Sequence, residues 1–278
     1  MKSAAIKKFI PKPFRKTIKY GMNAAADVAD LLRGKTDALV PPRRINYGGH
    51  QGFVECGDTY LRYFADLGRL RPDEHVLEVG CGFGRIARPL AGFLSGQGSY
   101  TGIDIVKSGV DWLTKAYSGY PNFSFRLSDL RNTTYNPTGT DDASSYTFPF
   151  ESETFDFVIL ISVFTHMLPA EVENYLREIA RVLRRGGRCY ITYFLLNEES
   201  TACVNTGKAS FLFTHALPGY RSTNTSSPLD AVAFDETYIR KLYAESGLTL
   251  AEPIHYGSWC HERTNPLDLQ DIVIGVKA

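Results

Sequence analysis

The chain has 278 residues, of which 44% are hydrophobic, so it is long enough to bury a sizeable core as one large domain or one domain with a cap. Its formal net charge at pH 7 is +1, which excludes a protein-wide field that would attract nucleic acid. No apolar run approaches the roughly 18 residues of a membrane span, and the N-terminal residues lack the apolar stretch of a secretory signal.

The N-terminal segment 1–20 is strongly basic, with seven lysines and arginines and no acidic residue. The remainder then has 24 basic and 30 acidic residues, a net charge of −6. The segment predicts contact with an anionic membrane surface or another acidic partner. The alternative is a solvated, poorly ordered tail, because Pro11 and Pro13 would interrupt an amphipathic helix. We assign residues 1–50 to a basic tail and linker.

Residues 21–75 are expected to form helical pieces, with a turn-rich linker at 36–53 and an amphipathic helix at 57–70. Strands and helices then alternate along the chain. The predicted strands are 75–80, 99–105, 123–130, 155–164, 188–196, 248–257 and 269–278. The predicted helices are 84–94, 108–118, 170–187 and 235–247, and the predicted long loops are 131–149 and 197–233. This alternation predicts an α/β fold with a mostly parallel sheet covered on both faces.

A glycine-rich turn, "EVGCGFG", lies between the first predicted strand and its helix. Ligands of open α/β sheets bind at this end of the strands, and glycines let a ligand approach the backbone. A dinucleotide site would have G-x-G-x-x-G, whereas here Gly80, Gly82 and Gly84 alternate and the sixth position is Arg85. Glu78 would face a pyrophosphate unfavourably, so it favours a cationic ligand.

This turn resembles the first motif of the class I S-adenosylmethionine-dependent methyltransferases, E/D-x-G-x-G-x-G. Residues 73–194 resemble that family in motif order, and 234–278 resemble it in pattern. The resemblance implies a Rossmann-like, doubly wound, seven-stranded sheet, mostly parallel with the last strand antiparallel and helices on both faces. It also implies that residues 51–278 form the methyltransferase domain and that S-adenosylmethionine is the cofactor.

The resemblance implies roles for individual residues. Asp104 would accept hydrogen bonds from both ribose hydroxyls, and Asp129 would accept one from the adenine amino group, beside Leu130. Glu78 would act through the methionine amino group or by ordering the glycine loop, two roles that remain open. The implied cofactor contacts are Glu78, Gly80, Cys81, Gly82, Gly84, Asp104, Ile105, Asp129, Leu130 and Ser162.

The fourth strand ends in "SVFTHMLP", where the resemblance places the transferring methyl group near the acceptor. The imidazole of His166 could serve as a general base because its pKa lies near neutrality, or it could cap a helix, hydrogen-bond the backbone or serve the cofactor pocket. His215, His255 and His261 are further candidates for the base. Asp141 and Asp142 read as a solvated turn, so no metal site is predicted. The expected acceptor contacts are Phe164, Tyr193, Tyr256 and Trp259.

The two long loops, 131–149 and 197–233, lie at the ligand end and are expected to bind the acceptor. Their hydroxyls, amides and aromatics suit a small molecule or glycan, and equally a disordered surface loop. The basic tail suits a lipid-linked acceptor. We expect no nucleic-acid partner, since the chain outside the tail is acidic and "NPPY" is absent after the fourth strand. Three hypotheses remain: an O-methyltransferase, an N- or C-methyltransferase of a metabolite, and an inactive binding subunit.

The cysteines predict a reducing, cytoplasmic location. The basic residues of segment 1–20 predict peripheral contact with the inner face of a membrane. There are five cysteines, they are scattered, and no two form a C-x-x-C pair. This arrangement suggests neither a disulfide framework nor a zinc site.

Overall fold

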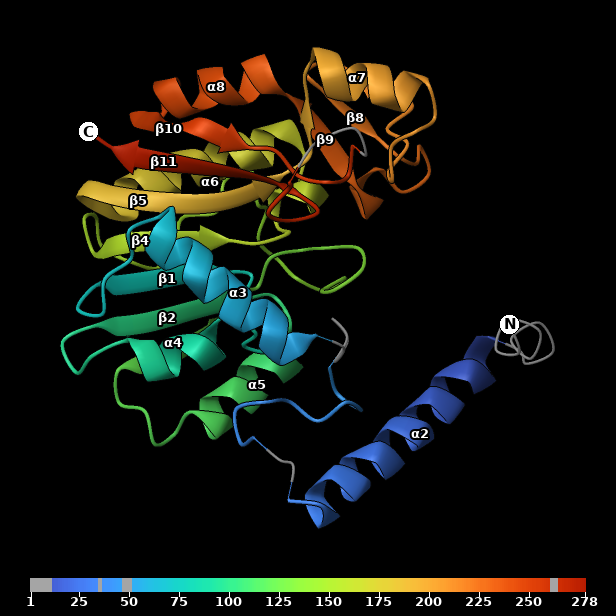
Figure 1. Ribbon diagram of the computed structural model, residues 1–278, viewed down its shortest axis with the longest axis vertical. Coiled ribbons are helices and arrows are strands. Elements are labelled where there is room, and N and C mark those ends of the chain that lie inside the picture. The colour runs from blue at the N-terminus through green and yellow to red at the C-terminus, as the bar shows by residue number, and fades with distance from the viewer. Residues whose placement is uncertain (1–11, 35–36, 47–51, 261–264) are drawn as a thin grey trace.

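The computed structural model describes residues 12–34, 37–46, 52–260 and 265–278, and its centre is a seven-stranded sheet (Figure 1). The strand order is β10-β11-β5-β4-β1-β2-β3. The strands are β1 (His75–Val79), β2 (Ser99–Asp104), β3 (Phe123–Leu127), β4 (Phe155–Leu160), β5 (Leu183–Tyr193), β10 (Leu248–His255) and β11 (Asp271–Lys277). Only the pairs of β11 with β10 and β5 are antiparallel. This confirms the predicted mostly parallel sheet with an antiparallel last strand.

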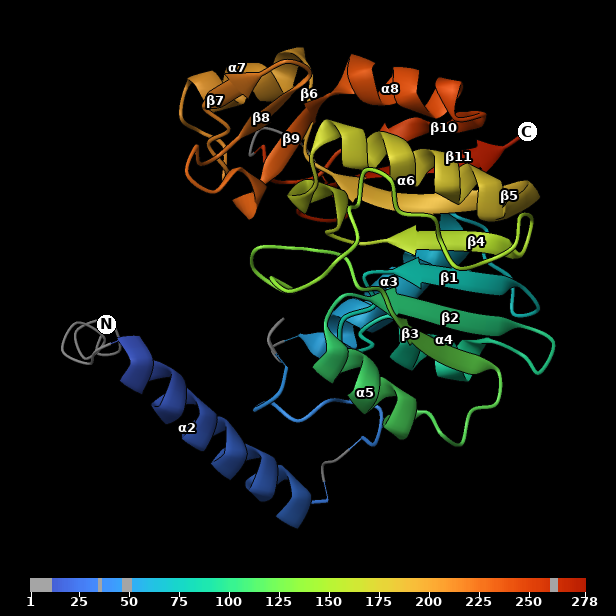
Figure 2. The same ribbon diagram turned by 180° about the vertical axis from the view of Figure 1, so that it is seen from behind.

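Helices cover both faces of this sheet, as Figures 1 and 2 show from opposite sides. The helices that pack on it are α3 (Phe53–Asp66), α4 (Ala87–Phe93), α5 (Lys107–Ala116), α6 (Pro169–Val182) and α8 (Glu236–Glu245). Buried residues of α6 and α8 belong to one hydrophobic cluster, and those of α3, α4 and α5 belong to a second. The two clusters are the two halves of a doubly wound core.

Helix α6 shows how the sequence forms one of these layers. Its buried residues Val172, Leu176 and Ile179 recur at helical spacing and therefore face the sheet together. Pro169 stands in the first turn, where its missing N–H leaves no hydrogen bond unmade. The helix ends at Val182, not at residue 187 as predicted, because β5 already begins at the next residue.

A second sheet of four strands, in the order β6-β9-β8-β7, occupies most of the region predicted as a loop at 197–233. The prediction of an irregular loop there was wrong. The region contains β6 (Leu195–Leu196), α7 (Glu198–Asn205), β7 (His215–Leu217), β8 (Tyr220–Ser222), the 3-10 turn η2 (Pro228–Asp230) and β9 (Val232–Asp235). It has its own small core, in which Phe194, Phe213 and Trp259 meet. Both views place this sheet, with the loop after β3, at the edge where β4 ends.

The N-terminal segment forms a helix, α2 (Lys12–Leu32), that lies apart from the layered body (Figures 1 and 2). The expectation that prolines prevent a helix here was wrong for the described residues. Pro13 lies in the first turn of α2, which tolerates proline, and residues 1–11, including Pro11, lie outside the described chain. None of the helices among the described residues is both long and apolar enough to cross a membrane.

Candidate functional site

The glycine turn joins β1 to α4 and depends on glycine at both of its ends. Gly80 and Gly84 have φ angles of +84° and +80°, a region that side chains rarely adopt. A Cβ atom at Gly80 would lie 2.6 Å from a methyl carbon of Val163, and one at Gly84 would lie 2.5 Å from a methyl carbon of Leu113. The turn therefore holds its backbone close to neighbouring elements, and no other residue fits at either position without strain.

Asp104, the last residue of β2, ties this turn to the next strand. Its carboxylate accepts hydrogen bonds from the backbone N–H of Gly82 at 2.7 Å and of Val106 at 2.8 Å. Burial raises the pKa of Asp104, and the bonds from backbone amides partly offset that rise. A carboxylate can accept about four hydrogen bonds, so acceptor capacity remains beyond these two. The predicted contact with ribose hydroxyls stays a prediction.

Glu78, in β1, and Cys81, within the turn, both have buried side chains. The Tyr100 hydroxyl donates a hydrogen bond to the Glu78 carboxylate. Burial raises the pKa of Glu78 to about 8, although the Tyr100 bond opposes that rise. Burial also raises the pKa of the Cys81 thiol, which packs against Gly102. The two roles predicted for Glu78, through the methionine amino group or by ordering the loop, both stay predictions.

The end of β3 provides the third part of the predicted cofactor site. Leu130 is buried, Ile105 is half-buried, and Asp129 is exposed. The Asp129 carboxylate accepts hydrogen bonds from the Asn136 side-chain amide at 3.2 Å and from the Thr140 hydroxyl at 3.0 Å. Asp129 therefore anchors the loop that follows β3. The contact with adenine stays a prediction for this residue.

Ser162 follows β4 in a strained conformation, with a φ of +57°. Its N–H donates to the Thr192 hydroxyl at 2.8 Å, and its own hydroxyl donates to the Gln270 side-chain oxygen at 3.1 Å. These three residues come from the ends of β4 and β5 and from the segment before β11. The sequence prediction missed Gln270 and Thr192, because no local motif marks either residue.

His166 ends the 3-10 turn η1 (Phe164–His166) and is half-buried. Its Nδ1 lies 2.8 Å from the carbonyl oxygen of Leu229 in η2. A carbonyl can only accept, so Nδ1 carries the proton and Nε2 keeps its lone pair. The contact thus selects the tautomer that a base needs. Among the other candidates, His215 lies in β7 and His255 ends β10, while His261 lies outside the described residues.

The predicted acceptor contacts need correction for three of the four aromatics. Phe164, Tyr193 and Trp259 are fully buried, so their side chains support the walls of the site from inside. Trp259 donates its indole N–H to Asp271, and Tyr193 pairs with another buried hydroxyl. Tyr256 is half-buried, and its hydroxyl donates to Glu236 at 2.8 Å. The prediction confused aromatic residues near strand ends with exposed ones.

A family model described as a methyltransferase domain matches residues 77–191. The match begins in β1, includes the glycine turn and ends in β5, so it covers the strands that carry Asp104, Asp129 and Ser162. The chain contains a class I S-adenosylmethionine-dependent methyltransferase domain. Its cofactor is S-adenosylmethionine, and the turn, Asp104 and the end of β3 are the parts of the described chain that would hold it.

Similar proteins extend this methyltransferase assignment but differ in their acceptors. The O-methyltransferase cnsE of Penicillium expansum is 33% identical over 130 residues, which are 44% of this chain and 40% of that protein. The tRNA N(3)-cytidine methyltransferase METTL2 of Gallus gallus is 32% identical over 120 residues, 40% of this chain and 28% of that protein. The chain spans 41% and 40% of the length of two curated relatives that it matches. The shared domain therefore identifies the cofactor and leaves the acceptor open.

Solved methyltransferases share the fold over nearly the whole chain. The 1,6-didemethyltoxoflavin-N1-methyltransferase of Burkholderia thailandensis, solved with its namesake substrate and S-adenosylhomocysteine, is 17% identical. The match has a TM-score of 0.51 and covers 97% of this chain and 91% of that chain. At this identity the likeness concerns the fold alone.

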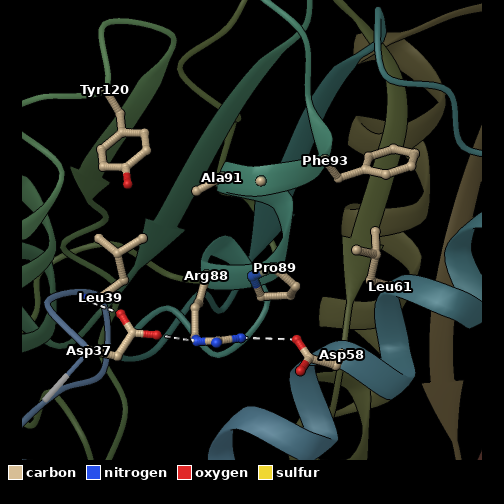
Figure 3. Close-up of a pocket in the computed structure, with 10 residues that line it drawn as sticks. Asp37, Leu39, Asp58, Leu61, Arg88, Pro89, Ala91, Phe93 and Tyr120 are labelled. Atoms are coloured by element: carbon tan, nitrogen blue, oxygen red, sulfur yellow. Dashed lines mark hydrogen bonds and ion pairs between the residues drawn. The ribbon is translucent and has the colours of Figure 1, made fainter. Parts of the chain in front are cut away.

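Neither the acidic pair Asp141 and Asp142 nor the pocket beside α3 adds a further ligand site among the described residues. Within the described ranges, no group of three or more His, Cys, Asp or Glu side chains could hold a metal ion. Asp142 instead accepts hydrogen bonds from the Ser144 N–H and hydroxyl, as in a local turn. A pocket of about 480 Å³ lies between α3, α4 and the segment at 37–39 (Figure 3). There Arg88 pairs with Asp37 and Asp58, so its charge is offset, and no predicted site residue lines the pocket.

Proposed function

We propose that the chain transfers the methyl group of S-adenosylmethionine to a hydroxyl of a small molecule or a glycan, including a sugar linked to lipid. Bound S-adenosylmethionine supplies an electrophilic methyl group. The chain itself must hold the acceptor in line, exclude water and remove the hydroxyl proton. The observation that carries the proposal is the contact of His166 Nδ1 with the Leu229 carbonyl, because it leaves Nε2 able to accept that proton.

The surroundings of His166 support an acceptor site at this place. The 3-10 turns η1 and η2 contact each other, and η2 belongs to the four-stranded unit at the ligand edge of the main sheet. An imidazole whose second ring nitrogen keeps its lone pair can accept the proton of a hydroxyl. The similarity to an O-methyltransferase of Penicillium expansum also favours an oxygen acceptor.

Charge favours a small acceptor over a nucleic acid. Residues 21–278 have a net charge of −6, since 24 basic residues face 30 acidic ones. Nucleic-acid binding depends on many phosphate contacts from lysine and arginine, and an acidic body opposes them. The basic segment 1–20 is instead proposed to meet an anionic membrane surface, where a lipid-linked acceptor would be found.

Methyl transfer to nitrogen or carbon of a metabolite is the second candidate, favoured by the didemethyltoxoflavin N1-methyltransferase, which shares the fold. An inactive binding subunit is disfavoured, since the glycine turn and Asp104 are intact.

The test uses the full chain with S-adenosylmethionine that carries a labelled methyl group. Panels of phenols, sugars and amines are offered as acceptors, and NMR of the product identifies the methylated atom. We expect the label on oxygen. Label on nitrogen or carbon would overturn the hydroxyl assignment, and cofactor binding without transfer to any panel would favour a binding role.

The role of His166 is tested by His166→Asn, whose side-chain amide can still donate to the Leu229 carbonyl from the place of Nδ1 but cannot act as a base. We expect the rate of methyl transfer to fall at least about a hundredfold. The matched control is His75→Asn, since His75 is half-buried at the opposite end of β1. A loss under about fivefold would contradict the base role.

A further inference from the structure

The helix α2 carries a polar stripe that faces the segment at 43–44. The Asn23 side-chain amide donates to the Arg43 carbonyl at 3.1 Å. Asp27 accepts from the Arg43 N–H at 2.8 Å and pairs with the Arg44 guanidinium at 3.0 Å, while Asp30 pairs with Arg43. Positions 23, 27 and 30 lie on one side of a helix. The two carboxylates of α2 therefore face the segment at 43–44, and their negative charges are offset by its arginines.

A different side of α2 exposes large apolar residues to solvent. Leu32 is 81% exposed and Leu31 is 64% exposed, and Tyr20 and Val28 are both 54% exposed. Val28 follows Tyr20 by eight residues, and Leu31 and Leu32 follow Val28 by three and four. At 3.6 residues per turn these spacings bring the four side chains to one side of the helix. We call them the apolar face of α2. Contiguous exposed apolar surface of this kind marks an interaction site, because water solvates it unfavourably.

The basic residues that adjoin this face along the chain indicate an anionic partner. The seven lysines and arginines of residues 1–20 adjoin the apolar face along the chain, with no acidic residue among them. A helix that combines an apolar face with adjacent basic residues binds in the plane of an anionic lipid surface. The rest of the protein is acidic, so this attraction is confined to the N-terminal segment.

We propose that α2 docks the protein on an anionic membrane, with Tyr20, Val28, Leu31 and Leu32 inserted among the lipids. In both views α2 lies on the same side of the main sheet as the four-stranded unit (Figures 1 and 2). The inference rests on the membrane contact proposed above and is independent of which atom is methylated.

The experiment measures binding of the full chain to lipid vesicles by flotation, without cofactor or acceptor. Phosphatidylcholine vesicles are compared with vesicles that also contain phosphatidylglycerol. We expect binding to the anionic vesicles only, weakened by salt as the charges are screened. The double variant Leu31→Glu/Leu32→Glu should bind at least about tenfold more weakly, because it places carboxylates on the inserted side.

The matched control is Met22→Glu, which changes a 69% exposed apolar residue of α2 that lies outside the apolar face and should leave vesicle binding unchanged. Calorimetric binding of S-adenosylmethionine checks that each variant is folded. Equal binding to neutral vesicles, no binding, or full binding by the double variant would overturn the proposal. A dimer in sedimentation that the double variant converts to a monomer would also overturn it, since the face would then join two copies. Methyl transfer is assayed separately with soluble acceptors, so the failure of either proposal is distinguishable.

Discussion

The two halves of the ligand edge are built in different ways. The cofactor half, at the ends of β1, β2 and β3, consists of a short glycine turn and carboxylates that follow strands. Its central contact joins Asp104 to Gly82, which are 22 residues apart. The proposed acceptor half joins distant segments: His166 contacts Leu229 across 63 residues, and the Leu195 N–H donates to Asp271 across 76 residues.

This difference explains what the sequence could predict. A turn that must hold backbone near a ligand needs glycine at set positions, so it leaves a local pattern that can be recognised. A wall made by tertiary contact can use any residue with the right reach, and its pattern is spread over the chain. The comparison predicts that damage to the cofactor half and to the acceptor half will be separable.

The largest effect is expected for Asp104→Ala, which breaks the cofactor half. The change removes the acceptor that holds the Gly82 and Val106 amides, together with the capacity predicted for the ribose hydroxyls. Charge-assisted hydrogen bonds contribute about 1.5–3 kcal/mol each, so affinity for S-adenosylmethionine should fall at least about a hundredfold. Calorimetric titration with S-adenosylmethionine and S-adenosylhomocysteine measures it.

The matched control for this change is Asp111→Ala in α5, because Asp111 is exposed and only pairs with Lys107 one turn earlier. Its affinity should equal that of the unchanged chain. Binding by the Asp104 variant within about threefold of the control would show that the turn holds the cofactor without this carboxylate.

A smaller effect is expected for Asp271→Asn, which breaks the acceptor half. The buried Asp271 carboxylate accepts from the N–H groups of Leu195 and Gly257 and from the Trp259 indole, so it joins β11 to the four-stranded unit. The side-chain NH2 group of asparagine is itself a donor, so it cannot accept hydrogen bonds from the surrounding N–H groups. We therefore expect the free energy of unfolding to fall by about 2 kcal/mol. Denaturation in urea measures the loss.

Cofactor binding by the Asp271→Asn variant, measured at urea concentrations below those that unfold it, tests whether the two halves of the ligand edge are independent. Affinity for S-adenosylmethionine should stay within about threefold of the unchanged chain, because Asp271 contacts no part of the glycine turn. A loss of affinity as large as that of the Asp104 variant would show that the two halves form one cooperative site.

The fold follows the same division. The order of strands and helices from β1 to β5 was predicted because apolar runs and helical spacing are local signals. The unit at 195–235 was missed, since β7 and β8 have only three residues each and their core includes Trp259 from beyond β10. Short strands of this kind are stabilised by contacts that no local pattern records.

Individual site residues were predicted with the same limits. Asp104 was found from its place at the end of a strand. Phe164, Tyr193 and Trp259 were taken for acceptor contacts, yet burial of a large aromatic is the more common outcome, and exposure is a tertiary property. Gln270 was missed because it reaches the site only through the pairing of β11 with β5.

The smallest effect at neutral pH is expected for Glu78→Gln, which changes the buried carboxyl group of β1 next to the glycine turn. The folded chain raises the pKa of Glu78 from 4.5 to about 8, so between these values the folded state keeps a proton that the unfolded chain releases. Its contribution to stability is full below about 4.5 and is lost as pH rises to about 8, by at most about 1.4 kcal/mol per pH unit. Glutamine has no proton to release, so urea denaturation of the variant should show a flatter decline across this range, whereas Glu173→Gln on the exposed side of α6 should not. An unchanged slope would mean that Glu78 is ionised in the folded chain, and the carboxylate would then have to be offset by a charge near the turn rather than by burial.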